Sequence, residues 1–238
     1  MTLVEVLIAV TLVALLSTAM LFALRAALSS VEAIRHNAER VRKGAGAQRI
    51  LEQQFANLMP VFTRCGALAP GDPGYNAAFF DGEPNVLRFV TAYSIAEAGR
   101  GQPRIVEIFP IPGENGEGVR LVVNERQYFS MYSAAALCQP PGPPTEGGGP
   151  PTVLFARPLA LPSSFVLADR LESAGFGYQE ISRLHPEGIW LPRWNYSAVF
   201  PTAVRVDMRP LDPNPAWLPP LPLYVRIMMD RSSNEGLE

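Results

Sequence analysis

Residues 1–24 read MTLVEVLIAVTLVALLSTAMLFAL, and this stretch decides how the chain is organised. It contains no Lys, Arg, Asp or His, and Glu5 is its single charged residue. A helix rises about 1.5 Å per residue, so this segment is long enough to cross a hydrocarbon core roughly 30 Å thick. A carboxylate in such a segment costs about 2.5 to 3.5 kcal/mol on insertion scales, and its own segment offers it no partner. We therefore expect another chain to supply the partner of Glu5, which argues for assembly rather than catalysis.

The helical pattern continues beyond the apolar stretch as far as Pro60. Apolar residues recur at spacings near three and four, while charged and amide side chains take the other faces. This pattern predicts an amphipathic helix over 25–59 that packs along one side. A coiled coil is the weaker interpretation, because no strict heptad is sustained. The apolar positions are Leu28, Val31, Ile34, Ala38, Val41, Ala45, Leu51, Phe55 and Leu58.

From Pro60 the composition changes to turn clusters and short β-rich segments. The segments at 86–93, 104–109 and 119–125 are separated by turn-rich residues, which predicts an antiparallel meander. Residues 138–152, CQPPGPPTEGGGPPT, are too rich in Pro and Gly to bury a core, so we expect an exposed loop there. Further apolar segments follow at 153–156, 165–178, 188–194, 200–208 and 223–229.

These patterns predict an α+β fold in which a long N-terminal helix packs against an antiparallel β-sheet. Antiparallel sheets commonly bury one face against a helix, and we expect that arrangement here. The predicted regions are an apolar half-helix at 1–24, an amphipathic half-helix at 25–59 and a β-rich domain at 60–238.

The two cysteines, Cys65 and Cys138, show neither a CxxC spacing nor a neighbouring His cluster, which argues against a zinc site. In a domain outside the cytoplasm they are able to form one disulfide. Two unpaired thiols are equally consistent with the sequence, because a bridge requires Cα atoms within roughly 7 Å. Both alternatives stay open at this point.

The composition and motifs argue against several classes of function. A net charge of −2 gives no basic surface for nucleic acids, so we expect neither DNA nor RNA as a partner. The two histidines, His36 and His185, lie in the predicted helix and in a polar loop before a proline. The chain has no GxSxG, HExxH or phosphate-binding loop, and its carboxylates are scattered as on a solvated surface. We expect no enzyme, no cofactor and no metal site.

Residues 1–10, MTLVEVLIAV, resemble the start of a mature type IV pilin-like protein, whose consensus reads Phe-Thr-Leu-Ile-Glu before an apolar run. The resemblance implies that a prepilin peptidase removes a leader just before Met1 and methylates the new N-terminus. Met1 would then replace the usual Phe. It also implies that Glu5 pairs with the N-terminal amine of a neighbouring subunit. Direct insertion from the first residue and an ordinary membrane anchor with one unpaired acid are the alternatives to this processing.

The C-terminal segments are similar to one branch of that family, the type II secretion minor pseudopilin J proteins. In these proteins a Phe-x-Tyr segment precedes two tryptophans, a Leu-Pro-x-x-Val strand and a final apolar strand. This chain has the same order in Phe176 with Tyr178, Trp190 with Trp194, 201–204 and 223–228. Plain core packing also accounts for these aromatic residues, because Trp and Tyr bury a large area without needing a ligand.

The resemblance implies a minor pseudopilin of type II secretion. Such a protein crosses the bacterial inner membrane once, keeps its C-terminal domain in the periplasm and assembles with other minor pseudopilins and the major pseudopilin at the pseudopilus tip. A minor pilin of a type IV pilus, serving adhesion, motility or DNA uptake, is one alternative. A single-pass periplasmic binding module that never polymerises is another.

Overall fold

The computed structural model divides into two compact units, Met1–Ala45 and Gly46–Glu238. The structure describes residues 2–66, 74–139, 153–183, 185–196, 199–211 and 223–226. Within these ranges, only the backbone is described at residues 29, 31–44 and 223–226.

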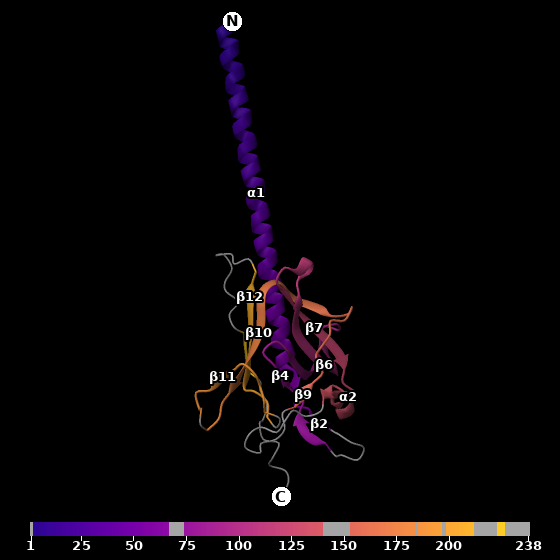
Figure 1. Ribbon diagram of the computed structural model, residues 1–238. Helices are drawn as coiled ribbons and strands as arrows, with labels where there is room; N and C mark the ends of the chain where they lie inside the picture. Colours follow the sequence, from indigo (N-terminus) through magenta and orange to yellow (C-terminus); the bar gives the residue numbers. More distant parts are fainter. Residues whose placement is uncertain are drawn as a thin grey trace. The chain divides into compact units, whose positions relative to one another are not determined.

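The predicted long helix is present as α1 (Leu3–Ala56), which contributes residues to both units (Figure 1). The prediction that it continues to residue 59 is wrong. The helix ends earlier because residues of the sheet bond the carbonyls near its C-terminus. The amide of Ala92 donates to the Asn57 carbonyl at 2.9 Å, and the Thr91 hydroxyl donates to the Gln54 carbonyl at 3.0 Å. Leu58–Met59 then forms the short strand β1, which pairs with β5.

The expected antiparallel sheet is the centre of the second unit. Among the described residues its strand order is β1-β5-β6-β7-β10-β12-β13, with β4 beside β5 and β11 beside β10. The predicted meander is confirmed as β5, β6 and β7, which pair in sequence. The further strands of this sheet are β4 (Asp81–Gly82), β5 (Leu87–Ser94), β6 (Gly99–Pro112), β7 (Val119–Gln127), β10 (Phe165–Glu180), β11 (Ile189–Leu191), β12 (Ala203–Pro210) and β13 (Leu223–Arg226). A short 3-10 helix, η1 (Glu114–Gly116), lies between β6 and β7.

One face of the sheet packs on the end of α1. Ala47, Leu51 and Phe55 recur every four residues and are at most 3% exposed. The Phe55 ring stacks on that of Phe89, with centroids 5.0 Å apart. Full burial of such a large apolar side chain contributes about 1.5–3 kcal/mol. The facing sheet residues are Leu87, Phe89, Val106, Ile108, Leu121 and Val123.

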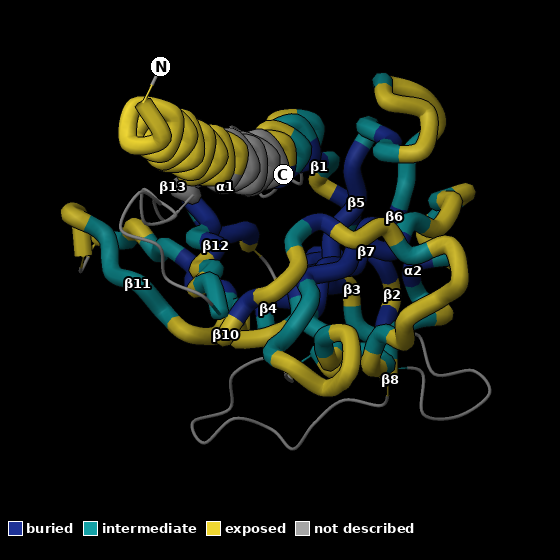
Figure 2. The backbone as a smooth tube through the Cα atoms, turned by 90° about the horizontal axis from the view of Figure 1, so that it is seen from above, coloured by how far each residue is buried: buried dark blue, intermediate teal, exposed yellow. Residues whose placement is uncertain are grey.

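The other face of the sheet is buried as well, whereas the sequence predicted burial only against the helix. A second layer covers it on the far side of β5–β7 from the end of α1, as Figure 2 shows. It encloses an apolar cluster of Val61, Phe79, Val90, Ile105 and Ala134. This outer layer consists of β2 (Phe62–Cys65), β3 (Tyr75–Ala78), α2 (Met131–Ala135), β8 (Cys138–Gln139) and β9 (Leu154–Phe155).

Gln54 is a polar exception at the interface between α1 and the sheet. Its side chain is 0% exposed, and neither its amide nitrogen nor its amide oxygen has a hydrogen-bond partner among the described residues. An unpaired buried amide costs about 1–3 kcal/mol by mutational measurements. An apolar side chain of similar volume is therefore expected to be more stable at this position.

We predict that Gln54→Met raises the free energy of unfolding by about 1–2 kcal/mol, because it removes the unpaired amide at similar volume. Urea denaturation of the full chain in detergent measures this change. Gln48→Met, on the exposed side of α1, is the matched control and should stay within about 0.5 kcal/mol. A loss of stability on Gln54→Met would mean that an ordered water molecule satisfies the amide.

Candidate functional site

The N-terminal part of α1 is an apolar helix whose described side chains are exposed. Leu3–Leu28 is long and apolar enough to cross a membrane, and none of its most apolar stretch is buried. Figure 2 shows this part of the helix coloured as exposed throughout. Single side chains such as Leu3 and Met20 are 82% and 77% exposed. So much apolar surface requires lipid or other apolar chains around it.

The hydroxyl groups of this segment satisfy themselves within the helix. Thr11 donates to the Ile8 carbonyl at 2.9 Å, Ser17 to the Val13 carbonyl at 2.8 Å, and Thr18 to the carbonyl three residues before it at 2.9 Å. Such back-bonding removes the cost of placing a hydroxyl among apolar groups. These three side chains therefore need no partner outside the helix.

Glu5 differs from these hydroxyls because its charge is not neutralised within the described residues. Its carboxylate accepts a single long hydrogen bond, 3.4 Å, from the backbone amide of Thr2. Met1, the predicted site of processing and methylation, lies outside the described residues. An exposed carboxylate in an otherwise apolar helix is suited to binding one cation or ammonium group from another chain.

Cys65 and Cys138 are joined by a disulfide, which decides between the two alternatives that the sequence left open. Their Cα atoms are 5.5 Å apart, and 73 residues separate them along the chain. The bond links β2 to β8 and so ties together two parts of the outer layer. It belongs to the unit Gly46–Glu238, whereas Glu5 belongs to the unit Met1–Ala45.

Three of the four aromatic residues singled out in the C-terminal segments pack as core residues, whereas Trp190 is half-buried and its ring centroid lies 5.3 Å from the Arg205 guanidinium. Phe176, Tyr178 and Trp194 are at most 6% exposed. The Tyr178 hydroxyl donates to the Glu83 carbonyl at 2.7 Å, and burial raises the pKa of this phenol. The Trp194 indole N–H donates to the carbonyl of Val199 at 2.9 Å. Packing and these two bonds account for the three side chains without a ligand.

A row of buried polar side chains crosses β5, β6 and β7, and the sequence analysis did not predict it. Arg88, Glu107 and Asn124 lie directly opposite one another in the sheet register and are at most 1% exposed. Arg88 bonds Glu107 through Nε at 2.9 Å and Asp81 through Nη1 at 2.7 Å. Asn124 donates to the second oxygen of Glu107 at 3.1 Å. We call Asp81, Arg88, Glu107 and Asn124 the buried polar row.

The segment 154–164 supplies the remaining partners of the buried polar row. Arg88 Nη2 donates to the Ala156 carbonyl at 2.6 Å, and Asn124 Nδ2 donates to the Leu159 carbonyl at 2.9 Å. The Ser164 hydroxyl bonds the Asn124 amide oxygen at 2.5 Å. Buried charges are tolerated only when they are paired and fully hydrogen-bonded. The buried polar row therefore needs the segment 154–164 in this position, because the segment provides the acceptors for Arg88 and Asn124.

The expectation that the carboxylates lie on a solvated surface is therefore wrong for Asp81 and Glu107. The sequence did contain a local sign of this pairing. Arg88 and Glu107 carry opposite charges, and each interrupts a run of apolar strand residues. In a sheet buried on both faces, such residues must pair with each other. Among the described residues no group of three His, Cys, Asp or Glu side chains is placed to hold a metal ion. The bonds of the row join β5, β6 and β7 to one another and to the segment 154–164.

We predict that Arg88→Met lowers the free energy of unfolding by about 3–5 kcal/mol, because it removes the buried cation that pairs with both Asp81 and Glu107. Chemical denaturation of the full chain measures this change. Arg126→Met is the matched control, since Arg126 contacts the same Glu107 at 3.4 Å but its side chain is 43% exposed. Its loss should be no more than about 1 kcal/mol. Equal losses in the two variants would contradict the assigned role of Arg88.

Asp81 gives the buried polar row a pH dependence. Burial raises the pKa of Asp81 from 3.8 to about 7, although the charge of Arg88 acts in the opposite direction. A carboxyl group whose pKa is higher in the folded state binds its proton more tightly there. Its contribution to stability is therefore present at low pH and is lost as the pH rises toward about 7.

We predict that the stability advantage of the wild type over Asp81→Asn shrinks as the pH rises between about 4 and 7, by at most about 1.4 kcal/mol per pH unit. Urea denaturation across this range measures the difference. Glu97→Gln, at a side chain that is 54% exposed, provides the matched comparison. An advantage that grows with pH would show that pairing with Arg88 outweighs burial.

No family model, curated protein or solved structure matches the chain. The candidate functional site is the exposed apolar segment of α1 together with Glu5. The folded domain carries the disulfide and the buried polar row.

Proposed function

We propose that this protein is a minor pseudopilin of a type II secretion system. In this role it joins other minor pseudopilins to form the tip that initiates a short periplasmic pseudopilus, to which the major pseudopilin is added. One observation carries the proposal: the exposed apolar segment Leu3–Leu28 of α1 holds a single acid, Glu5, that lacks a cationic partner among the described residues.

The assembly step follows from the energetics of that helix. Before assembly the segment lies in the inner membrane, where lipid covers its apolar side chains. On assembly the helix leaves the lipid and packs among equivalent helices, so its apolar surface stays out of water in both states. The carboxylate gains most, because a buried charge is stable only when it is paired. The N-terminal amine of a neighbouring subunit, exposed when a prepilin peptidase cuts before Met1, is the proposed partner of Glu5.

The folded domain supports a location in the periplasm. Disulfides persist in oxidising compartments, and the bacterial periplasm is one of them. The bond between Cys65 and Cys138 ties the outer layer of the domain together. The order of the aromatic segments, from Phe176 to the last strand, supports the pseudopilin branch over a type IV pilus.

We predict that Glu5→Ala and Glu5→Gln reduce incorporation of the full chain into tip complexes at least tenfold, because loss of a buried pair costs several kcal/mol. Co-purification with the other minor pseudopilins and the major pseudopilin measures this. Glu172→Ala, at a side chain that is 57% exposed, is the matched control and should assemble normally.

A second readout separates failed assembly from failed folding. The Cys65–Cys138 disulfide should still form in the Glu5 variants, because Glu5 and the cysteines belong to different units. Alkylation of free thiols in cells reports this. Normal incorporation of Glu5→Ala would refute the proposed role of Glu5. Loss of surface pili without loss of protein secretion would instead place the protein in a type IV pilus.

A further inference from the structure

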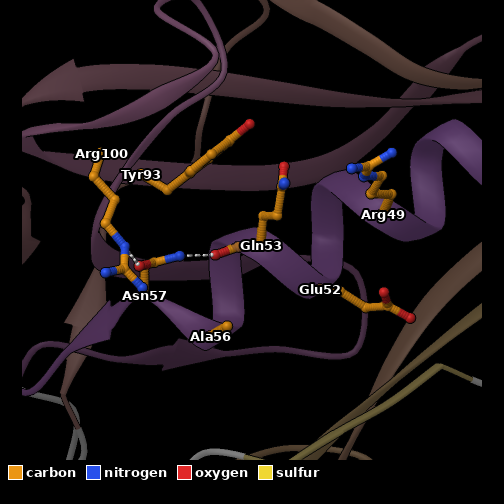
Figure 3. A pocket seen from close by; sticks show the side chains of 7 residues that line it. All are labelled: Arg49, Glu52, Gln53, Ala56, Asn57, Tyr93 and Arg100. Atoms are coloured by element: carbon orange, nitrogen blue, oxygen red, sulfur yellow. Dashed lines mark hydrogen bonds between the residues drawn. The ribbon is translucent and has the colours of Figure 1, made fainter.

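A shallow depression of about 480 Å³ lies where the end of α1 meets β5 and β6 (Figure 3). Its walls are rich in hydrogen-bond donors, including two guanidinium groups, a phenol and amides. We call this depression the arginine groove. The residues that line it are Arg49, Glu52, Gln53, Ala56, Asn57, Tyr93 and Arg100.

Arg100 is held in place by Asn57, the residue that follows α1. The Asn57 amide nitrogen donates to the Gln53 carbonyl at 2.7 Å, which fixes the orientation of the Asn57 side chain. Its amide oxygen then accepts a bond from Arg100 Nε at 2.6 Å, and Figure 3 shows this chain of two bonds. Only Nε is used, so the two terminal nitrogens of the guanidinium make no hydrogen bond among the described residues.

The other donors of the arginine groove are also uncommitted. Neither the Arg49 guanidinium nor the Tyr93 hydroxyl has a hydrogen-bond or ion-pair partner among the described residues, and Arg49 is exposed. The one acid of the lining, Glu52, accepts a bond from Gln48 at 3.0 Å. In Figure 3 its carboxylate points away from Tyr93 and Arg100. The lining therefore has an excess of positive charge.

These donors are suited to carboxylates. A guanidinium presents two parallel N–H groups that match the two oxygens of a carboxylate, and such bonds are stronger than neutral ones. Arg49 and Arg100 stand at opposite ends of the arginine groove in Figure 3, so more than one carboxylate can bind along it. A ligand that binds both arginines must therefore be acidic and extended.

The shallow form of the arginine groove favours a protein over a small anion. Pockets for small molecules enclose most of the ligand surface, whereas this one is open along one side. A small dicarboxylate would stay largely hydrated here. A protein surface would cover the site and exclude water, and Arg and Tyr are the residue types that most often anchor such contacts.

We propose that the arginine groove is a docking site for an acidic segment of a partner protein, with carboxylates bound by Arg49 and Arg100 and a further bond from Tyr93. The inference goes beyond the proposed function and does not depend on it. Both guanidiniums are needed, because each binds at one end of the groove.

A peptide of alternating Glu and Gly, labelled with fluorescein, tests the docking site by fluorescence anisotropy at low ionic strength. The full chain in detergent should bind this peptide and should not bind its counterpart of alternating Gln and Gly. The double substitution Arg49→Gln with Arg100→Gln should weaken binding at least tenfold, as expected for the loss of charged partners in an interface. Tyr93→Phe, which removes one hydroxyl, should weaken it about threefold.

The matched control is Arg183→Gln with Arg209→Gln, which removes the same charge from two exposed positions. It should change the affinity less than twofold, and thermal unfolding should be the same for all variants. Three results would each overturn the proposal: no binding by the wild type, an equal loss in the control, or displacement of the peptide by glutarate or inorganic phosphate at concentrations as low as those of unlabelled peptide. The last result would identify a site for small anions.

Discussion

The guanidinium of Arg88 holds two carboxylates inside the sheet, and the layered structure of the domain depends on this arrangement. A charge in the middle of a central strand is acceptable only when every polar atom around it is bonded. The carbonyls of Ala156 and Leu159 complete the set, so the segment that carries them must cross the outer face of the sheet. That segment also covers the apolar cluster beside the row, which explains why neither face of the central strands meets water. Polar bonding thus specifies the position of the outer layer, and apolar burial stabilises it.

Much of the fold was predictable because its signals are local. The spacing of Leu51 and Phe55 indicates the helix face that enters the core, and the turn-rich stretches between apolar segments indicate the meander. The end of the helix was predicted wrongly because it depends on residues far along the chain. Pro60 marks a local stop, yet Thr91 and Ala92 of β5 bond the carbonyls of Gln54 and Asn57 before the chain reaches it. Likewise, the outer layer joins strands too short to show a period, such as β8 and β9.

Functional and polar features of the chain also differ in how far the sequence alone reveals them. Glu5 is conspicuous in the sequence because it is the only charge in the apolar stretch, and no tertiary information is needed to find it. The buried polar row needs the sheet register, since Arg88 and Glu107 are 19 residues apart and meet only when β5 and β6 pair as they do. The arginine groove needs still more, because Asn57, Tyr93 and Arg100 come together only after the helix has docked on the hairpin. The lone charge was therefore readable in advance, whereas contacts between distant strands were not.

The disulfide encloses a long span of the domain, so the bond can close only after that whole span has been made. The loop between Cys65 and Cys138 contains β3 to β7 and α2, which is the whole central meander. Because synthesis runs from the N-terminus, Cys65 appears first, and its partner follows only after every strand of the meander. Pairing of the two thiols thus brings together the two ends of the segment that forms the meander. In the proposed periplasmic location, a chain with free thiols would differ chemically from the folded protein before it met any neighbour.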